Sequence, residues 1–168
     1  ILLLGIGGEG HDGAFLSDTI LLASIQPSTE AVALLSIPRD LSVAVAKNEW
    51  RKINAISAFA ESTAPGSGGE AMRSALENLL QIPIPYVVRV DFEGFEQFID
   101  TIGDITVVVE NRIDDPRYPV KGNEYLYPVT ERYEHLVIEP GTQSMNGSLA
   151  LKYARSRRGY GVEGSDFA

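Results

Sequence analysis

The apolar residues of this chain fall into short runs, such as residues 1–4 and residues 20–23. Runs of this length suit strands that are buried in a sheet. None approaches the roughly 18 consecutive apolar residues that a membrane-spanning helix requires. The pattern therefore predicts that no segment of this chain spans a membrane, and it favours a core built on a β-sheet.

Two of the apolar segments predict a β-hairpin. Residues 19–25 and 31–37 are both apolar, and the five residues between them include Pro27 and Ser28, which are typical of turns. The sheet should therefore contain at least one antiparallel pair of buried strands. Further strands are expected over residues 1–6, 41–46, 86–90 and 105–109.

Other segments repeat apolar residues at helical spacing. Asp91 and Asn146 are of the type that caps the start of a helix, and Gly103 is of the type that follows its end. Helices are expected to begin within residues 55–59 and to cover residues 70–81, 92–102 and 147–154.

Residues 110–139 are polar and contain three prolines, so they predict a long loop. Elsewhere strands alternate with helices, and one pair of strands forms a hairpin. This order predicts an α/β fold, a three-layer α/β/α sandwich with a central mixed β-sheet.

The charge of the chain restricts its partners. With 14 basic and 23 acidic residues the net charge is −9, which argues against nucleic acid or an anionic membrane surface as a broad partner. Arg155, Arg157 and Arg158 nevertheless lie within four positions, and the guanidinium fork matches phosphate oxygens. The cluster predicts either an anion site or a solvated helix end. The absence of cysteine excludes thiolate metal sites and thiol nucleophiles.

A glycine-rich loop follows the first strand. Residues 5–10 have the glycine spacing of a dinucleotide fingerprint, and Glu30 lies where a ribose-binding acid would belong. The fingerprint must open a helix, but residues 11–17 lead directly into the next strand. We therefore reject nucleotide binding and expect a polar loop at a sheet end, where α/β sheets bind ligands.

The predicted hairpin should bring three charged residues together. Asp18 precedes one strand and Arg39 and Asp40 follow the other, so all three are expected at the same end of the sheet. They predict either a salt bridge or a site for Mg²⁺ and a phosphate, with Glu9 or Asp12 as further metal ligands. His11 and His135 lack zinc-ligand spacing and are expected to have loop or surface roles.

Three motifs occur in this order: Ser-Asp-Thr at residues 17–19, Leu-Ser-Ile-Pro-Arg-Asp at 35–40 and Tyr-Ala-Arg-Ser-Arg at 153–157. With these motifs the chain resembles the LytR-CpsA-Psr (LCP) domain of bacterial cell-envelope proteins. The resemblance covers essentially the whole chain. The other matching segments, in order, are residues 1–6, 52–55, 88–95 and 140–143.

The resemblance implies a Mg²⁺-dependent phosphotransferase, for which Mn²⁺ is the alternative ion. Such enzymes transfer a glycopolymer from a polyprenyl-pyrophosphate carrier to a peptidoglycan hydroxyl and form a phosphodiester. It implies a cell-membrane location, with the domain on the extracytoplasmic face. Residues 1–168 are then one catalytic domain, truncated at its C-terminus and lacking an N-terminal membrane anchor.

The resemblance also assigns roles to single residues. Asp18 matches the metal-binding acid, Arg39 and Arg155 match pyrophosphate-binding arginines, and Arg157 matches a supporting charge. In addition, Lys52 and Asn54 match a recurrent pocket motif. The remaining candidates are Arg158 for substrate binding and Asp40 for catalysis.

Two departures from the family pattern keep other functions open. Gly7 stands where many members have a second metal-binding Asp, so Glu9 or Asp12 would have to replace it. The Asp-Phe-Gly-Arg segment of the family is matched by residues 166–168, after which the chain stops. The alternatives are a non-catalytic or regulatory polyprenyl-pyrophosphate-binding module, and a pyrophosphatase without a sugar acceptor.

Overall fold

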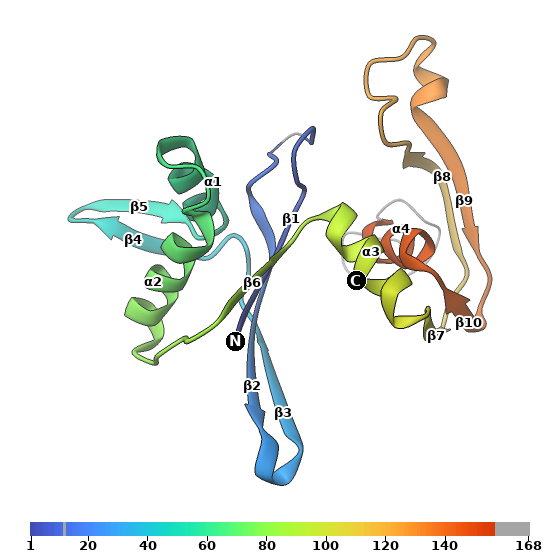
Figure 1. Ribbon diagram of the computed structural model, residues 1–168. Coiled ribbons are helices and arrows are strands. Elements are labelled where there is room, and N and C mark those ends of the chain that lie inside the picture. The colour runs from blue at the N-terminus through green and yellow to red at the C-terminus, as the bar shows by residue number, and fades with distance from the viewer. Residues whose placement is uncertain (12, 157–168) are drawn as a thin grey trace. The chain divides into compact units, whose positions relative to one another are not determined.

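The computed structural model describes residues 1–11 and 13–156. The chain divides into two compact units, with the boundary between Gly94 and Phe95. The first unit contains a four-stranded sheet and a small strand pair, and the second contains two strand pairs (Figure 1).

The sheet of the first unit has four strands in the order β3-β2-β1-β6. Strand β1 pairs with β6 in parallel, whereas β1–β2 and β2–β3 are antiparallel, so the sheet is mixed. This confirms the predicted α/β class, the mixed sheet and the hairpin. The strands are β1 (Leu2–Ile6), β2 (Ser17–Gln26), β3 (Ala31–Ser36) and β6 (Val87–Val90).

The start of β2 and the ends of β1, β3 and β6 lie on one side of this sheet, here named the sheet edge. Leu4 of β1 lies opposite Ile20 of β2 and also opposite Arg89 of β6. Because β2 runs against β1 and β3, and β6 is parallel to β1, the first residues of β2 lie on the same side of the sheet as the last residues of β1, β3 and β6. The glycine-rich loop, Asp18 and Arg39 therefore all belong to the same edge.

One face of the sheet packs against two helices, α1 (Asn54–Thr63) and α2 (Gly68–Leu80). The start of a helix was predicted within residues 55–59, and the second helix was predicted over residues 70–81 from the spacing of its apolar residues. A small hairpin of β4 (Ser42–Ala46) and β5 (Glu49–Lys52) precedes them, and η1 (Pro27–Thr29) joins β2 to β3. The buried core comprises Leu2, Leu4, Ile20, Ile37, Val43, Ile53, Met72, Leu76 and Ile84.

Strand β3 differs from its prediction as a buried strand. All of its residues are exposed, and Leu34 retains 65% of its accessible surface. The reason is that β3 is the outermost strand of the sheet, whereas α1 and α2 pack against β2 and β6.

The second unit contains most of α3 (Phe92–Ile102) and all of α4 (Gly147–Arg155), each with its predicted cap. Asp91 accepts a hydrogen bond from the Gly94 N–H at 2.8 Å, and Asn146 accepts one from the Leu149 N–H at 2.9 Å. The strand pairs join β7 (Ile105–Val109) to β10 (Gly141–Met145), and β8 (Ile113–Pro119) to β9 (Tyr133–Ile138), with η2 (Val129–Arg132) before β9.

The β8–β9 hairpin corrects the prediction of a long loop over residues 110–139. Ile113 and Asp115 of β8 and Leu136 and Ile138 of β9 are buried, whereas the residues between them are more exposed. This alternation is typical of strands with one buried face and one solvent-exposed face. The residues of the exposed face make the segment polar on average. The prolines obscured the alternation because Pro is usually kept out of sheet interiors.

The start of α4 lies tightly against α3. A Cβ atom at Gly147 would lie 2.1 Å from the Glu96 carbonyl oxygen, so only glycine fits there. The Gly147 N–H also donates to Asp100 Oδ1 at 2.7 Å. These contacts fix where α4 begins, and with it the helix that carries Arg155. The hydrophobic core of this unit comprises Ile99, Val109, Ile113, Tyr118, Leu136, Ile138, Met145 and Ala150.

Candidate functional site

A charged cluster lies at the edge of the first sheet where β2 begins and β3 ends. Arg39 Nη1 donates to Asp18 Oδ1 at 2.8 Å, and the two side chains are 40% and 49% exposed. The predicted meeting of these residues is confirmed. Because both side chains are partly exposed, a bound anion can contact Arg39 without unfolding the edge.

Asp40 extends this cluster toward β5. It pairs with Lys52 Nζ, and one of its oxygens lies 3.8 Å from Arg39 Nε. The Lys52 ammonium, and to a smaller degree the Arg39 guanidinium, hold the pKa of the Asp40 carboxyl below its ordinary value. The Asn54 N–H donates to the Arg39 carbonyl at 3.2 Å. Four candidate side chains and the backbone of a fifth candidate therefore form one chain of contacts.

The glycine-rich loop at the same edge contains no helix in its described residues, so the rejection of a dinucleotide fingerprint is supported by the backbone. Gly8 has a φ of +85°, and a Cβ there would lie 2.9 Å from the Asp91 Cβ. The His11 and Phe92 rings meet edge to face at 5.0 Å. The loop is thus packed against the start of α3 rather than forming a helix.

The carboxylates at this edge supply some, but not all, of the oxygen ligands that a hard divalent cation requires. Mg²⁺ is usually held by one or two carboxylates together with waters and substrate phosphates. Asp18 supplies one carboxylate, and the exposed Glu9 lies in the neighbouring loop. Gly7 supplies no side-chain donor, and Asp12 lies outside the described residues. In the described part of the chain no three His, Cys, Asp or Glu side chains form a ready-made metal site.

Arg155 belongs to the second unit, where it is the last residue of α4. Tyr118 of β8 is buried, which raises the pKa of its phenol, and the nearby Arg155 charge acts in the opposite direction. One turn earlier, Lys152 Nζ pairs with Glu134 of β9 at 2.6 Å. The hairpin β8–β9 therefore holds the end of the helix that presents Arg155. The other two predicted arginines, Arg157 and Arg158, lie outside the described residues.

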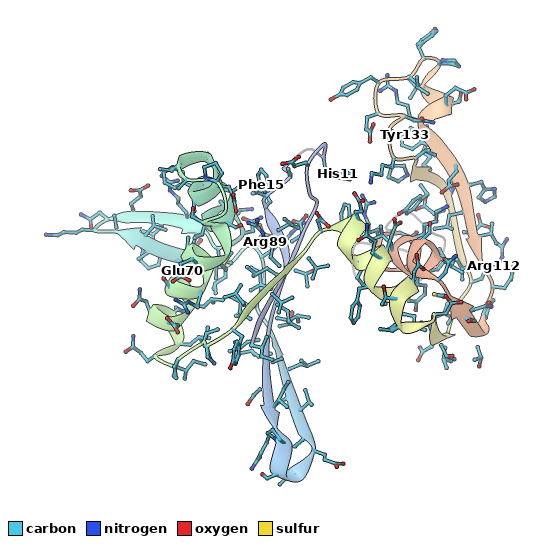
Figure 2. All side chains as sticks on the ribbon, in the orientation of Figure 1. His11, Phe15, Glu70, Arg89, Arg112 and Tyr133 are labelled. Carbon is cyan, nitrogen blue, oxygen red and sulfur yellow. The ribbon has the colours of Figure 1, made fainter. Side chains whose placement is uncertain are left out.

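One buried ion pair in the first unit was not predicted from the sequence. Glu61 of α1 is buried and pairs with Arg89 of β6, which Figure 2 labels. It also accepts hydrogen bonds from the N–H groups of Gly66 at 2.6 Å and Gly68 at 3.1 Å. Arg89, followed by these amides, keeps the pKa of Glu61 below its ordinary value. The only sequence signal was an acid shortly before a glycine-rich turn.

The fold and this edge define an α/β protein with an exposed acid–arginine–acid–lysine cluster, which suits an anion that carries phosphate oxygens. Comparison with known proteins agrees. The model of the LytR_cpsA_psr family matches residues 1–168. The chain belongs to this family.

Several relatives are named for teichoic acid transfer. The polyisoprenyl-teichoic acid–peptidoglycan teichoic acid transferase TagV of Bacillus subtilis is 32% identical over 164 residues. This match covers 94% of the present chain and 37% of that protein. The crystal structure of B. subtilis TagV gives a TM-score of 0.67 over 94% of this chain and 55% of that one.

TagT has been solved with two ligands. Its structure with bound octaprenyl pyrophosphate lipid is 28% identical, with a TM-score of 0.65, and covers 93% of this chain and 55% of that chain. Its structure bound to LIIa-WTA is 27% identical, with a TM-score of 0.68, and covers 98% and 55%. The present chain thus spans roughly half of the solved relatives and less than half of the curated one.

Proposed function

We propose that the protein carrying this chain transfers a glycopolymer from a polyprenyl-pyrophosphate carrier to a peptidoglycan hydroxyl. The observation that carries this proposal is the Asp18–Arg39–Asp40–Lys52 cluster at an exposed sheet edge, in a family whose member TagT binds octaprenyl pyrophosphate. A diphosphate is strongly anionic, so a protein with a net charge of −9 needs local cations to bind it.

The reaction forms one bond to phosphorus and breaks another. The acceptor hydroxyl oxygen bonds to the phosphorus that bears the glycopolymer, and the bond from that phosphorus to the bridging oxygen breaks. Polyprenyl phosphate leaves with the bridging oxygen, and the hydroxyl proton passes to a base. Catalysis of such a step depends mainly on positioning and on neutralising charge in the transition state.

The roles of the arginines follow from this charge. Arg39 donates to the diphosphate from the sheet edge, and Arg155 is proposed to donate from the end of α4. Arg157 and Arg158 supply further positive charge, as the sequence predicts. Removing one such donor typically costs about 3 kcal/mol of transition-state stabilisation.

Two pocket residues and a base complete the assignment. The proposed pocket residues are Lys52 and Asn54, which adjoin Asp40 and Arg39. Asp40 is the proposed proton acceptor. Its lowered pKa makes it a weak base, which a loose phosphoryl-transfer transition state tolerates.

Mg²⁺ is the proposed cofactor. Asp18 would hold it together with Glu9 or Asp12 from the adjacent loop, and substrate oxygens would complete its ligands. When bound, the ion neutralises charge that builds up on the phosphoryl oxygens. Mn²⁺, which also prefers oxygen ligands, is the alternative ion.

The proposed place of action is the cell envelope, with this domain on the extracytoplasmic face of the membrane. The relatives named as teichoic acid–peptidoglycan transferases support this location. Among the described helices, none has the length and apolar character needed to cross a bilayer.

The second candidate function is non-catalytic recognition of a polyprenyl pyrophosphate. Gly7 favours it, because no side-chain oxygen is available where many family members have an acid. In this case the arginines bind the donor, but the transition state is not stabilised enough for transfer.

The test compares Arg39→Ala with Arg51→Ala in the full-length protein. Arg51 is the matched control, because its partners Glu49 and Phe59 are not members of the edge cluster. With lipid-linked donor, Mg²⁺ and peptidoglycan, Arg39→Ala should lower turnover by about a hundred- to a thousandfold. The control should change turnover little.

Each other outcome of this test has a defined meaning. Donor binding without release of polyprenyl phosphate at any Mg²⁺ concentration supports the recognition module. Phosphate products formed without peptidoglycan identify a pyrophosphatase. Equal turnover by wild type and Arg39→Ala removes Arg39 from the mechanism.

A further inference from the structure

The direction of Arg155 depends on how α4 ends. Ser156 follows the helix with extended backbone angles, φ −63° and ψ 127°, and its N–H donates to the Lys152 carbonyl at 3.0 Å. Ser156 is 7% exposed, so the chain turns inward directly after Arg155. A contact that holds Ser156 in place therefore also sets the position of the Arg155 backbone, from which its side chain extends.

A buried carboxylate fixes Ser156. The Ser156 hydroxyl donates to Asp115 Oδ2 at 2.9 Å, and the Arg117 N–H donates to Asp115 Oδ1 at 3.0 Å. Asp115 is only 2% exposed. A carboxylate buried this deeply is costly unless its oxygens are hydrogen-bonded, so a packing role alone would be filled at lower cost by an apolar residue.

An irregularity in β8 explains how Asp115 reaches α4. The pairing of β8 with β9 shifts register between Asp115 and Tyr118. In a regular strand, residues three apart point to opposite faces, yet both of these side chains are buried. A bulge re-aims side chains in this way, and bulges are common next to functional sites. Asp115 consequently contacts the end of α4 at Ser156, and the buried Tyr118 lies near Arg155.

We propose that Asp115 is a positioning residue that sets the direction of Arg155 through Ser156. This inference rests on the proposed function, in which Arg155 binds the diphosphate. Tyr118 near Arg155 and Glu134 on Lys152 support the same last turn of the helix. The β8–β9 hairpin is thus a clamp, defined by these three contacts, that orients a substrate-binding arginine before the donor arrives.

The neighbouring residue Asp114 provides a matched control. It lies on the other face of the strand, where it pairs with Arg112 and with His135 Nε2 at 2.6 Å. Figure 2 labels Arg112 at the start of the hairpin. Asp114→Asn removes an acid of the same type from the same strand without touching α4.

The experiment measures turnover of the lipid-linked donor for Asp115→Asn in two backgrounds. In the otherwise unchanged full-length protein, turnover should fall by about ten- to a hundredfold, because a small misplacement of a positioning group can cost about a hundredfold. In the Arg155→Ala background the same substitution should have no further effect. Asp114→Asn should leave turnover within about twofold of wild type in both backgrounds.

A second pair of variants guards against loss of folding. Ser156→Ala should reproduce the loss of turnover, and Ser156→Thr, which retains the hydroxyl, should restore it. Thermal unfolding of each variant identifies any that fails to fold. Equal fractional losses from Asp115→Asn with and without Arg155, or full turnover of both Asp115→Asn and Ser156→Ala, would overturn the inference alone. An inactive wild-type protein would overturn the proposed function, and the inference with it.

Discussion

The two units hold their candidate arginines in opposite ways. Arg39 makes ion pairs with carboxylates that are about half exposed, whereas the helix end that carries Arg155 is fixed by a carboxylate that is 2% exposed. Exposed pairs contribute little to stability and exchange readily with a ligand. Buried hydrogen-bonded groups cost much to break. The difference suggests that one arginine is free to exchange partners and the other is pre-oriented.

The comparison of buried and exposed carboxylates predicts its largest effect on stability for a substitution of the buried Glu61. Glu61→Ala should lower the free energy of unfolding by about 3 kcal/mol, because it leaves Arg89 unpaired and removes the acceptor of two backbone amides. Glu49→Ala is the control, since its pair with Arg51 is exposed. Chemical denaturation measures both variants. Equal losses would show that burial does not separate the two classes of ion pair.

A smaller effect on stability is expected at the sheet edge. Arg39→Ala should lower the free energy of unfolding by less than about 1 kcal/mol, because its side chain is 40% exposed. The same substitution should nearly abolish turnover. A large loss of stability, measured by the same denaturation assay, would mean that Arg39 is a structural residue rather than a ligand-binding one.

The smallest expected effect is a change in how the free energy of unfolding depends on pH in the acidic range. The pKa of Glu61 is lowered in the folded protein from an ordinary value of 4.5. Its contribution is therefore complete above about pH 4.5 and is lost as the pH falls through the lower folded-state pKa. Glu61→Gln should flatten the curve of unfolding free energy against pH in this acidic range. An unchanged slope below pH 4.5 would contradict the assignment.

The sequence was most informative where contacts are local. The short turn after β2 made the meeting of Asp18 and Arg39 predictable, because a hairpin fixes which strand ends are neighbours. The helix caps were equally predictable from Asp91 and Asn146, since each bonds an amide only three residues ahead.

The sequence was least informative where long-range packing decides. Asp115 lies in a proline-containing segment that we interpreted as a loop, and its partner Ser156 is 41 residues away. Nothing local marks such a residue as buried. The exposure of β3 likewise depends on which strands α1 and α2 cover, so its apolar composition was misleading. The assignments of Arg39 and Arg155 to a diphosphate came from family resemblance and stay predictions.

The most direct test of the account is a crystal structure of the full-length protein with a polyprenyl pyrophosphate analogue and Mn²⁺, located by its anomalous scattering. We predict that the diphosphate contacts both Arg39 and Arg155 and that the metal is bound by Asp18. A diphosphate bound away from Arg39, or a metal bound without Asp18, would contradict it.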